Sequence, residues 1–398
     1  MAATDRSQTP RLKSAIARLG SDPTPALAAL IQAALALPIF TAPARAGPID
    51  QGEAGLTFLG YKERGLMKIS EPIVWGHAQV AENWEIRASA AVDVVTGASP
   101  ELVSNVTGRP VQTVTGASVS DRRTTWDVKV SRRIGEATLG VSRAVSNEED
   151  YRSRAFGLEA KLDLNERNST INVAYGQSAD RVRSADDSAL DEPRDTREYL
   201  VGWTQVLSPL ALVQTTVQGS RGRGWYNDPY KHTLTFYPNG APAFAVDTRP
   251  SYRNSLAWIT RYRRHVPAAH ATLQADYRFY RDDWGIRSHT LEIAWSRSMG
   301  ERWSLRPALR LYSQSRADFY SPLIPQPAPA ILSSDQRLAA FGGVSPSLRA
   351  TLQLDGGWRF EGTVGYVHNA ANLQWGTGSD TFETLRAYYG IAGVSRAF

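Results

Sequence analysis

Apolar and polar side chains alternate along Trp84-Glu85-Ile86-Arg87-Ala88-Ser89-Ala90-Ala91-Val92-Asp93, along Ala271-Thr272-Leu273-Gln274-Ala275-Asp276-Tyr277-Arg278-Phe279 and along Trp303-Ser304-Leu305-Arg306-Pro307-Ala308-Leu309-Arg310-Leu311. Successive side chains of a β-strand point to opposite faces, so each segment has one apolar and one polar face. In a soluble sandwich the polar face meets bulk water. In an outer-membrane barrel the apolar face meets lipid and the polar face lines the lumen.

The first 46 residues differ from the rest of the chain. Lys13 and Arg18 precede an apolar run from Ala26 to Phe40, which Ala44-Arg45-Ala46 follows. A charged region, an apolar region and a small-residue cleavage site are typical of a secretory signal peptide. We therefore expect residues 1–46 to be removed on export through the inner membrane, and residues 47–53 to form a short periplasmic segment.

Composition excludes several classes of protein. The 398 residues include no cysteine, carry a formal charge of +6 and are 42% hydrophobic. The missing cysteine excludes disulfides, thiolate metal sites and a lipidated cysteine anchor. After the N-terminal region, no stretch approaches the roughly 20 apolar residues of a transmembrane helix. Lysine and arginine are spread along the chain without a basic block, so no nucleic-acid partner is expected.

Strand-like segments recur from residue 54 to the end. Long connections, such as 95–121 and 221–251, alternate with short turns, such as Asn165-Glu166-Arg167. Short periplasmic turns and long extracellular loops are typical of an up-and-down antiparallel barrel. We predict an all-β transmembrane barrel of about sixteen strands over residues 54–398, with both termini on the periplasmic side. The predicted strands are 54–63, 67–77, 83–94, 122–133, 135–146, 150–163, 168–178, 196–207, 209–220, 252–263, 268–281, 285–298, 301–314, 335–354, 358–370 and 384–398.

Three details bear on this prediction. Ser345-Pro346 can be a turn that divides the segment 335–354, which would make the strand count odd. The chain ends on Phe398, and a C-terminal aromatic residue is the usual assembly signal of outer-membrane barrels. Aromatic residues gather near the predicted strand ends, as membrane-interface girdles require. These are Trp84, Tyr151, Tyr199, Tyr280, Trp284, Trp303, Trp358, Tyr388 and Tyr389.

Charged residues occupy the polar faces of the predicted strands, which would face the lumen. Both signs are interleaved, so we expect cross-strand ion pairs. The set either braces the wall or forms a selectivity surface for a polar or anionic solute. Loops 95–121 and 221–251 can plug a lumen of this size by folding inward. The candidate lumen residues are Glu85, Arg87, Asp93, Arg123, Asp127, Lys129, Glu159, Lys161, Asp163, Asp276, Arg278, Glu292, Arg306 and Arg310.

Several stretches resemble one Gram-negative barrel family. Asp93-Val94-Val95-Thr96-Gly97-Ala98-Ser99-Pro100 is similar to the D-x-V-S-G-A-S-P motif of the family catalogued as domain of unknown function three-five-seven-zero, with Thr96 in place of the more usual Ser. The resemblance continues, in order, over almost everything after the predicted signal peptide. Further similar stretches are 149–155, 204–209, 222–231, 280–290 and 312–320.

The resemblance implies an outer-membrane barrel of unsettled function. Family members are often encoded beside a flavin-transferring protein and small thioredoxin-like or lipoprotein partners. That association suggests a periplasmic or surface redox partner, and it gives no mechanism. The implied location, the outer membrane, agrees with the predicted signal peptide and makes membrane lipid a further partner.

Loop motifs supply the remaining candidates. Thr-Gly-Ala-Ser occurs at Thr96–Ser99 and again at Thr115–Ser118, either as a repeated binding turn or as ordinary turn chemistry. Aspartates on one rim are a candidate Ca²⁺ site, although no calcium-binding spacing is present and we expect no metal and no cofactor. Arginine and tryptophan at the start of loop 221–251 can bind a sugar or an anionic headgroup. The loop candidates are Thr96, Gly97, Ser99, Arg221, Arg223, Trp225, Asp228, Asp282, Asp283 and Asp318.

An enzyme is not expected. Ser288 and His289 are adjacent on a predicted strand and therefore point to opposite faces, and no nucleophile elbow or metal-binding histidine pair is present. We expect an outer-membrane channel or conduit, porin-like, for a small polar solute. The alternatives are a barrel that anchors or sheathes a redox partner carrying a flavin or a cytochrome, and an outer-membrane hydrolase that uses His289.

Overall fold

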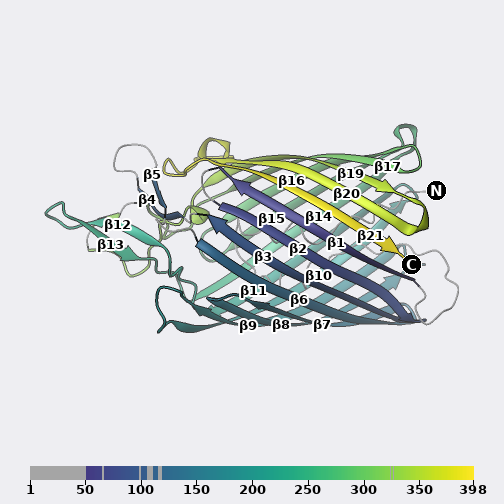
Figure 1. The fold of residues 1–398 in the computed structure, drawn as a ribbon, viewed down its shortest axis with the longest axis horizontal. Helices are drawn as coiled ribbons and strands as arrows, with labels where there is room; N and C mark the ends of the chain where they lie inside the picture. The colour runs from purple at the N-terminus through teal and green to yellow at the C-terminus, as the bar shows by residue number, and fades with distance from the viewer. Residues whose placement is uncertain are drawn as a thin grey trace.

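The computed structural model describes residues 51–398 except 65–66, 98–99, 105–110, 115–118, 323 and 326. The predicted signal peptide, 1–46, lies outside these residues, as does most of the predicted periplasmic segment, 47–53. Sixteen of the strands form one closed antiparallel barrel, in which β1 pairs with β21 (Figure 1). The predicted fold class is therefore confirmed. Among the described residues, no helix has the length and hydropathy needed to cross a membrane.

The barrel strands follow one another in sequence order around the wall. They are β1 (Gln51–Glu63), β2 (Met67–Ala81), β3 (Trp84–Gly97), β6 (Val119–Ile134), β7 (Ala137–Asn147), β8 (Tyr151–Leu164), β9 (Ser169–Arg183), β10 (Asp191–Ser208), β11 (Ala211–Gly224), β14 (Tyr252–Val266), β15 (Ala271–Asp282), β16 (Arg287–Met299), β17 (Trp303–Gln314), β19 (Phe341–Gln353), β20 (Trp358–Ala370) and β21 (Leu385–Ala397).

The long connections carry additional small elements at one end of the barrel (Figure 1). β1 begins and β21 ends at the opposite end. The hairpin β12–β13 projects beyond the barrel rim and does not enter the lumen, so loop 221–251 does not plug it. The elements in the long connections are β4 (Pro100–Ser104), β5 (Val111–Val114), β12 (His232–Phe236), β13 (Pro242–Val246), β18 (Ile324–Pro325), η2 (Gln336–Leu338) and η4 (Ala371–Leu373). Two short turns at the opposite end contain η1 (Pro267–Ala269) and η3 (Asp355–Gly357).

Four prolines lie inside barrel strands, and three of them interrupt one ladder; the fourth, Pro193 of β10, pairs with Arg181 of β9. Pairing of β19 with β20 passes from Val344 with His368 to Ser347 with Gly365, skipping Ser345 and Pro346. The same strand pairs without a break with β17. Proline has no N–H to donate, so it is tolerated only where one ladder bond is given up. The segment 335–354 therefore holds a single strand, and Pro72 and Pro307 interrupt their ladders in the same way.

The two faces of the wall differ as the alternation predicts. Large apolar side chains on the outer face are exposed, including Val74 at 60%, Val201 at 58% and Val364 at 63%. Their sequence neighbours on the inner face are small or polar and mostly buried. An apolar outer surface and a polar inner surface are the pattern of a barrel surrounded by lipid.

Candidate functional site

The predicted lumen residues all lie on the inward faces of their strands. On β8, for example, Leu158 and Leu162 face outward and are exposed, whereas Glu159 between them is buried on the inner side. The other candidates also lie on the inner face, because the residue opposite each of them on the neighbouring strand faces inward. The structure therefore places all fourteen candidate residues on the inner face of the wall.

Inward charges on the β3–β8 side of the barrel are paired into a lattice. The Lys129 ammonium contacts the Glu159 carboxylate, and both side chains are buried. Arg123 contacts Asp93, and its Nε lies 3.4 Å from Glu148 Oε1. Cross-strand pairs of opposite charge stabilise a barrel wall. The charges on the β3–β8 side therefore favour the interpretation that they brace the wall. Further contacts join Glu85 with Arg87 (2.6 Å), Asp127 with Ser89, and Asp163 with Arg133 (3.4 Å).

Arginine predominates on the inner face of β14–β20. Below the loop-bearing rim, the inward arginines of these strands are Arg261, Arg263, Arg278, Arg306, Arg310, Arg349 and Arg359, and their inward carboxylates are Asp276, Glu292 and Glu361. Arg359 Nη2 lies 3.2 Å from Glu53 Oε1 of the adjoining β1. Arg306 Nη2 lies 3.1 Å from Glu292 Oε1, and Arg263 Nη2 lies 3.0 Å from Asp276 Oδ2. For Arg278 and Arg310 no ion pair is found within the described part of the chain. We call this surface the arginine wall.

Several charged side chains on the inner face are partly exposed. Side-chain exposure is 30% for Glu85 and 35% for Arg87, near the start of β3, and 26% for Asp276 and 34% for Glu292 at mid-barrel. Such fractions require open space beside these side chains. These parts of the inner surface are therefore accessible to water, whereas Lys129, Glu159 and Arg261 on the same face are buried.

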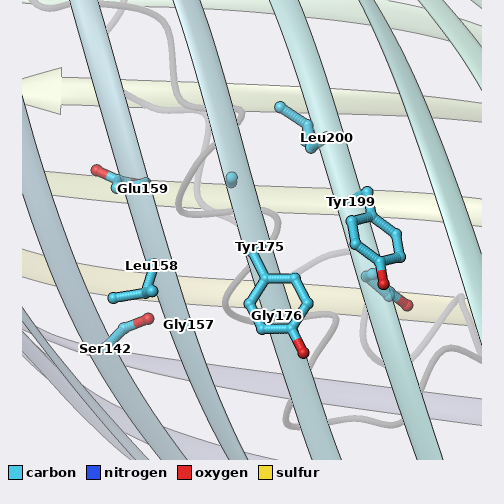
Figure 2. A pocket seen from close by; sticks show the side chains of 10 residues that line it. Ser142, Gly157, Leu158, Glu159, Tyr175, Gly176, Tyr199 and Leu200 are labelled. Carbon is cyan, nitrogen blue, oxygen red and sulfur yellow. The ribbon is translucent and has the colours of Figure 1, made fainter.

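A shallow depression lies within the wall of β8, β9 and β10. Gly157 pairs with Gly176 across the ladder there, and Tyr175 and Tyr199 lie side by side with ring centroids 5.5 Å apart (Figure 2). The residues that border it come from both faces of the wall, including outward Leu158. We therefore attribute the depression to small residues between strands and not to a ligand site.

The extracellular loops build a small hydrophobic core over one side of the barrel mouth. Trp284, Ala317, Leu338 and Phe382 come from three loops and are buried with Tyr280, near the loop-bearing end of β15. Asp282 anchors this loop core: its carboxylate accepts hydrogen bonds from Arg253 Nη2 (2.7 Å), the Tyr280 hydroxyl (2.9 Å) and the Ile286 N–H (2.9 Å). Tyr226 of loop 221–251 packs against the same core. These loops cover part of the opening.

A buried group of ions ties these loops to the projecting hairpin. Asp335 accepts hydrogen bonds from Arg249 Nη2 (2.9 Å) and Arg337 Nε (2.8 Å), and Arg337 also donates to Asp228 (2.6 Å). Burial alone would raise the pKa of Asp335, but the two arginines outweigh burial and hold the pKa well below its ordinary value. Burial lowers the pKa of the neighbouring Lys231 ammonium. We call this set, with Asp247, the loop ion cluster.

A cavity of about 630 Å³ opens between the extracellular loops. Asp283 and Asp318 border it together with Trp284, Phe319 and Tyr320. Asp283 accepts hydrogen bonds from the Asn254 backbone N–H (3.0 Å) and side-chain amide (2.7 Å). Aromatic faces beside carboxylates can contact a sugar or an organic cation.

The four candidate aspartates do not form a calcium site. Asp228 belongs to the loop ion cluster, Asp282 is occupied by Arg253, and only Asp283 and Asp318 border the same cavity. Within the described part of the chain, no group of three or more potential ligands is close enough to hold a metal.

The other loop candidates are scattered. Arg221 and Arg223 project outward from β11, away from the lumen, and are exposed. The Trp225 backbone N–H donates to the Pro193 oxygen (3.0 Å). Thr96 and Gly97 end β3, where they pair with Ser120 and Val119, whereas Ser99 and the repeat at 115–118 lie outside the described residues.

His289 and Ser288 lie on opposite faces of β16, as predicted. Ser288 is buried on the lumen side, whereas the His289 ring faces outward and stacks with Trp375 at 5.5 Å. Its Nδ1 lies 2.8 Å from the Tyr277 hydroxyl. This geometry does not bring the serine and the histidine together.

Sequence reasoning missed much of the arginine wall. Arg261, Arg263, Arg349 and Arg359 occupy the inward positions of predicted strands, so strict alternation could have found them. The loop ion cluster had no comparable signal, because its members lie up to 109 residues apart in sequence.

Three of the solved structures similar to this chain cover most of its length at low sequence identity. No curated protein matches the sequence. A solved "Bacterial polysaccharide outer membrane secretin" is similar at a TM-score of 0.48 and 8% identity, covering 87% of this chain and 98% of that one. An OmpT loop-deletion mutant, "an outer membrane protein of Vibrio cholerae", gives 0.44 and 8%, with 88% and 100% covered. The siderophore receptor PirA of Pseudomonas aeruginosa gives 0.43 and 10%, with 87% covered; this chain spans only 62% of its length.

Sequence comparison gives the more specific result. The profile described as "Protein of unknown function (DUF3570)" matches residues 27–193 and 180–382, which is most of the chain. The match includes the strands of the arginine wall and the loops over the mouth. This protein therefore belongs to the DUF3570 family.

Proposed function

We propose that this protein is an outer-membrane channel that conducts small polar solutes and favours anions. The observation that carries the proposal is the arginine wall, which places seven guanidinium groups against three carboxylates on the inner face of β14–β20, beside the partly exposed Asp276 and Glu292. Arginine is always protonated at physiological pH, so this charge is fixed. An excess of one sign of charge along one side of a lumen raises the local concentration of the opposite ion there.

The distribution of charge supports a preference for anions over a purely structural role. On the β3–β8 side, carboxylates neutralise the cations pairwise, as in Lys129 with Glu159. On the opposite side, Arg278 and Arg310 have no such partner among the described residues. A bracing lattice alone would gain nothing from unneutralised arginines, because unpaired charge in a confined space is costly.

Conductance in planar lipid bilayers tests the proposal. The barrel without residues 1–46 should give steps of current, and a salt gradient should give a reversal potential of the sign for anions. Arg310→Gln should shift that potential toward the value for a non-selective pore. Arg264→Gln is the matched control, since Arg264 carries the same charge but is exposed on the outer face.

Two results would refute the proposal. A barrel that passes no current at any voltage is not a channel. A channel whose reversal potential responds equally to Arg310→Gln and Arg264→Gln does not use the arginine wall for selection.

A further inference from the structure

Arginines also gather on the outer face at one end of β8–β11. This is the end of the barrel from which the long loops emerge (Figure 1). Arg152, Arg154, Arg181, Arg197, Arg221 and Arg223 all point away from the lumen and are exposed. We call these six residues the outer arginine collar. The exposed carboxylates on the outer face of the same region, among the described residues, are Asp191 and Asp195, so the collar carries a clear positive excess.

Two arginine pairs in the collar face each other directly across a ladder. Arg152 is the partner of Arg181 on the neighbouring strand, and Arg197 is the partner of Arg221. Side chains at directly opposed positions have Cβ atoms about 5 Å apart, and like charges there are destabilising. The pairing of Arg281 with Arg287 repeats this arrangement on β15 and β16. An anion between the two guanidinium groups would remove this repulsion. Arg181 already lies near one anionic group, because its Nη1 is 3.6 Å from Asp191 Oδ1.

The collar lies at the edge of the apolar band. Along the outer face of β10, Arg197 is followed by Tyr199, Val201 and Trp203, whose side chains are 45%, 58% and 45% exposed. On β8, Arg154 is followed by Phe156 and Leu158 in the same way. Aromatic residues of this kind mark the interface between hydrocarbon and headgroups. The arginines therefore lie at headgroup depth, on the side where the long loops emerge.

We infer that the outer arginine collar binds a phosphorylated glycolipid of the outer leaflet, of the lipid A class. Its acyl chains would lie against the apolar band, and each phosphate would fit between two opposed arginines. Guanidinium groups bind phosphate oxygens in a bidentate manner, and basic clusters beside a membrane recognise anionic headgroups. The inference rests on the outer-membrane location assumed under the proposed function, and it does not depend on conductance.

Lipid binding by the full barrel in detergent tests the inference. The probes are bis-phosphorylated lipid A, dephosphorylated lipid A and inorganic phosphate. The wild-type barrel should bind bis-phosphorylated lipid A at least tenfold more tightly than the double variant Arg197→Gln, Arg221→Gln. The control is Arg264→Gln, Arg297→Gln, which removes two exposed outer-face arginines at the opposite end and should bind like wild type. Dephosphorylated lipid A should bind weakly to all three proteins.

Thermal unfolding provides a second test, because the double variant should be more stable than wild type without lipid and should gain less stability from lipid A. Without lipid, removing the Arg197–Arg221 repulsion should raise the unfolding midpoint, whereas with lipid A the wild type should gain the larger stabilisation. Equal lipid affinities for the two double variants would overturn the inference, and so would competition by inorganic phosphate at concentrations equal to those of the lipid. A sealed barrel in the bilayer assay would refute the channel and leave these results unaffected.

Discussion

Replacing Asp335 by alanine should release the extracellular loops without unfolding the barrel. Asp335 is 5% exposed, and its carboxylate accepts hydrogen bonds from Arg249 Nη2, Arg337 Nε and the Arg337 backbone N–H at 2.9, 2.8 and 3.0 Å. The substitution leaves two arginines without their shared partner. The affected quantity is the free energy of local opening of loops 225–251 and 315–340.

The magnitude follows from the partners that remain. Removing one member of a buried ion pair typically costs about 3–5 kcal/mol, because a charge stays buried and uncompensated. Arg249 keeps Asp247 at 2.6 Å and Arg337 keeps Asp228 at 2.6 Å, so we expect the lower end of that range. A loss of about 3 kcal/mol raises the open population by a factor on the order of 100.

Amide hydrogen exchange measures this directly. Protection in the two loops should fall on the order of 100-fold in Asp335→Ala, while protection in the barrel strands and the heat-modifiable gel migration stay unchanged. Asp355→Ala is the matched control, because Asp355 pairs with Arg302 at a similar 2.8 Å but is 92% exposed. Exposed ion pairs contribute little, so its turn should exchange as in wild type. Unchanged loop protection in Asp335→Ala would refute the assigned role of the cluster.

Two further outcomes are expected. Gly285→Ala should destabilise the loop core by about 1–3 kcal/mol in chemical denaturation, because its φ is +87° and a Cβ would lie 2.2 Å from an Asp318 oxygen; unchanged stability would contradict this. Val201→Arg should lower barrel stability in lipid vesicles by about 2–4 kcal/mol if this outward position lies near the bilayer midplane, and an equal loss in detergent would argue against lipid contact.

Side-chain alternation was sufficient to predict the barrel wall. The period of two fixed the inward residues as soon as the strands were placed, because a shift of one residue would have exchanged both faces. Ser345-Pro346 shows the limit of that reasoning. Proline often indicates a turn, but here it lies inside β19, where only the hydrogen bonds to β20 are lost. Whether a strand can tolerate such a loss depends on its neighbouring strands, which the local sequence does not identify.

The structure of the loops could not be predicted from the sequence. Trp284, Ala317 and Phe382 show no common periodicity, and they meet only because the barrel brings their strand ends to one rim. The same holds for Asp228 and Arg337. The position of Arg221 was predicted incorrectly for a different reason. The sequence analysis places it in a loop as an anion-binding candidate, whereas it lies in β11 and faces outward. Assigning it to a strand would have required knowing that β11 extends to Gly224.

Closure of the barrel by its first and last strands has a consequence for assembly. Gly52 exchanges both backbone hydrogen bonds with Phe398 (3.0 and 2.9 Å), and Glu53 accepts a hydrogen bond from Ser395, which lies 342 positions later in the sequence. Until these bonds form, β1 and β21 are free edges that can pair with any exposed strand. Joining segments so distant in sequence carries a large entropic cost. The seam is therefore expected to be the slow step of barrel formation, and a cell must shield two open edges until Phe398 reaches Gly52.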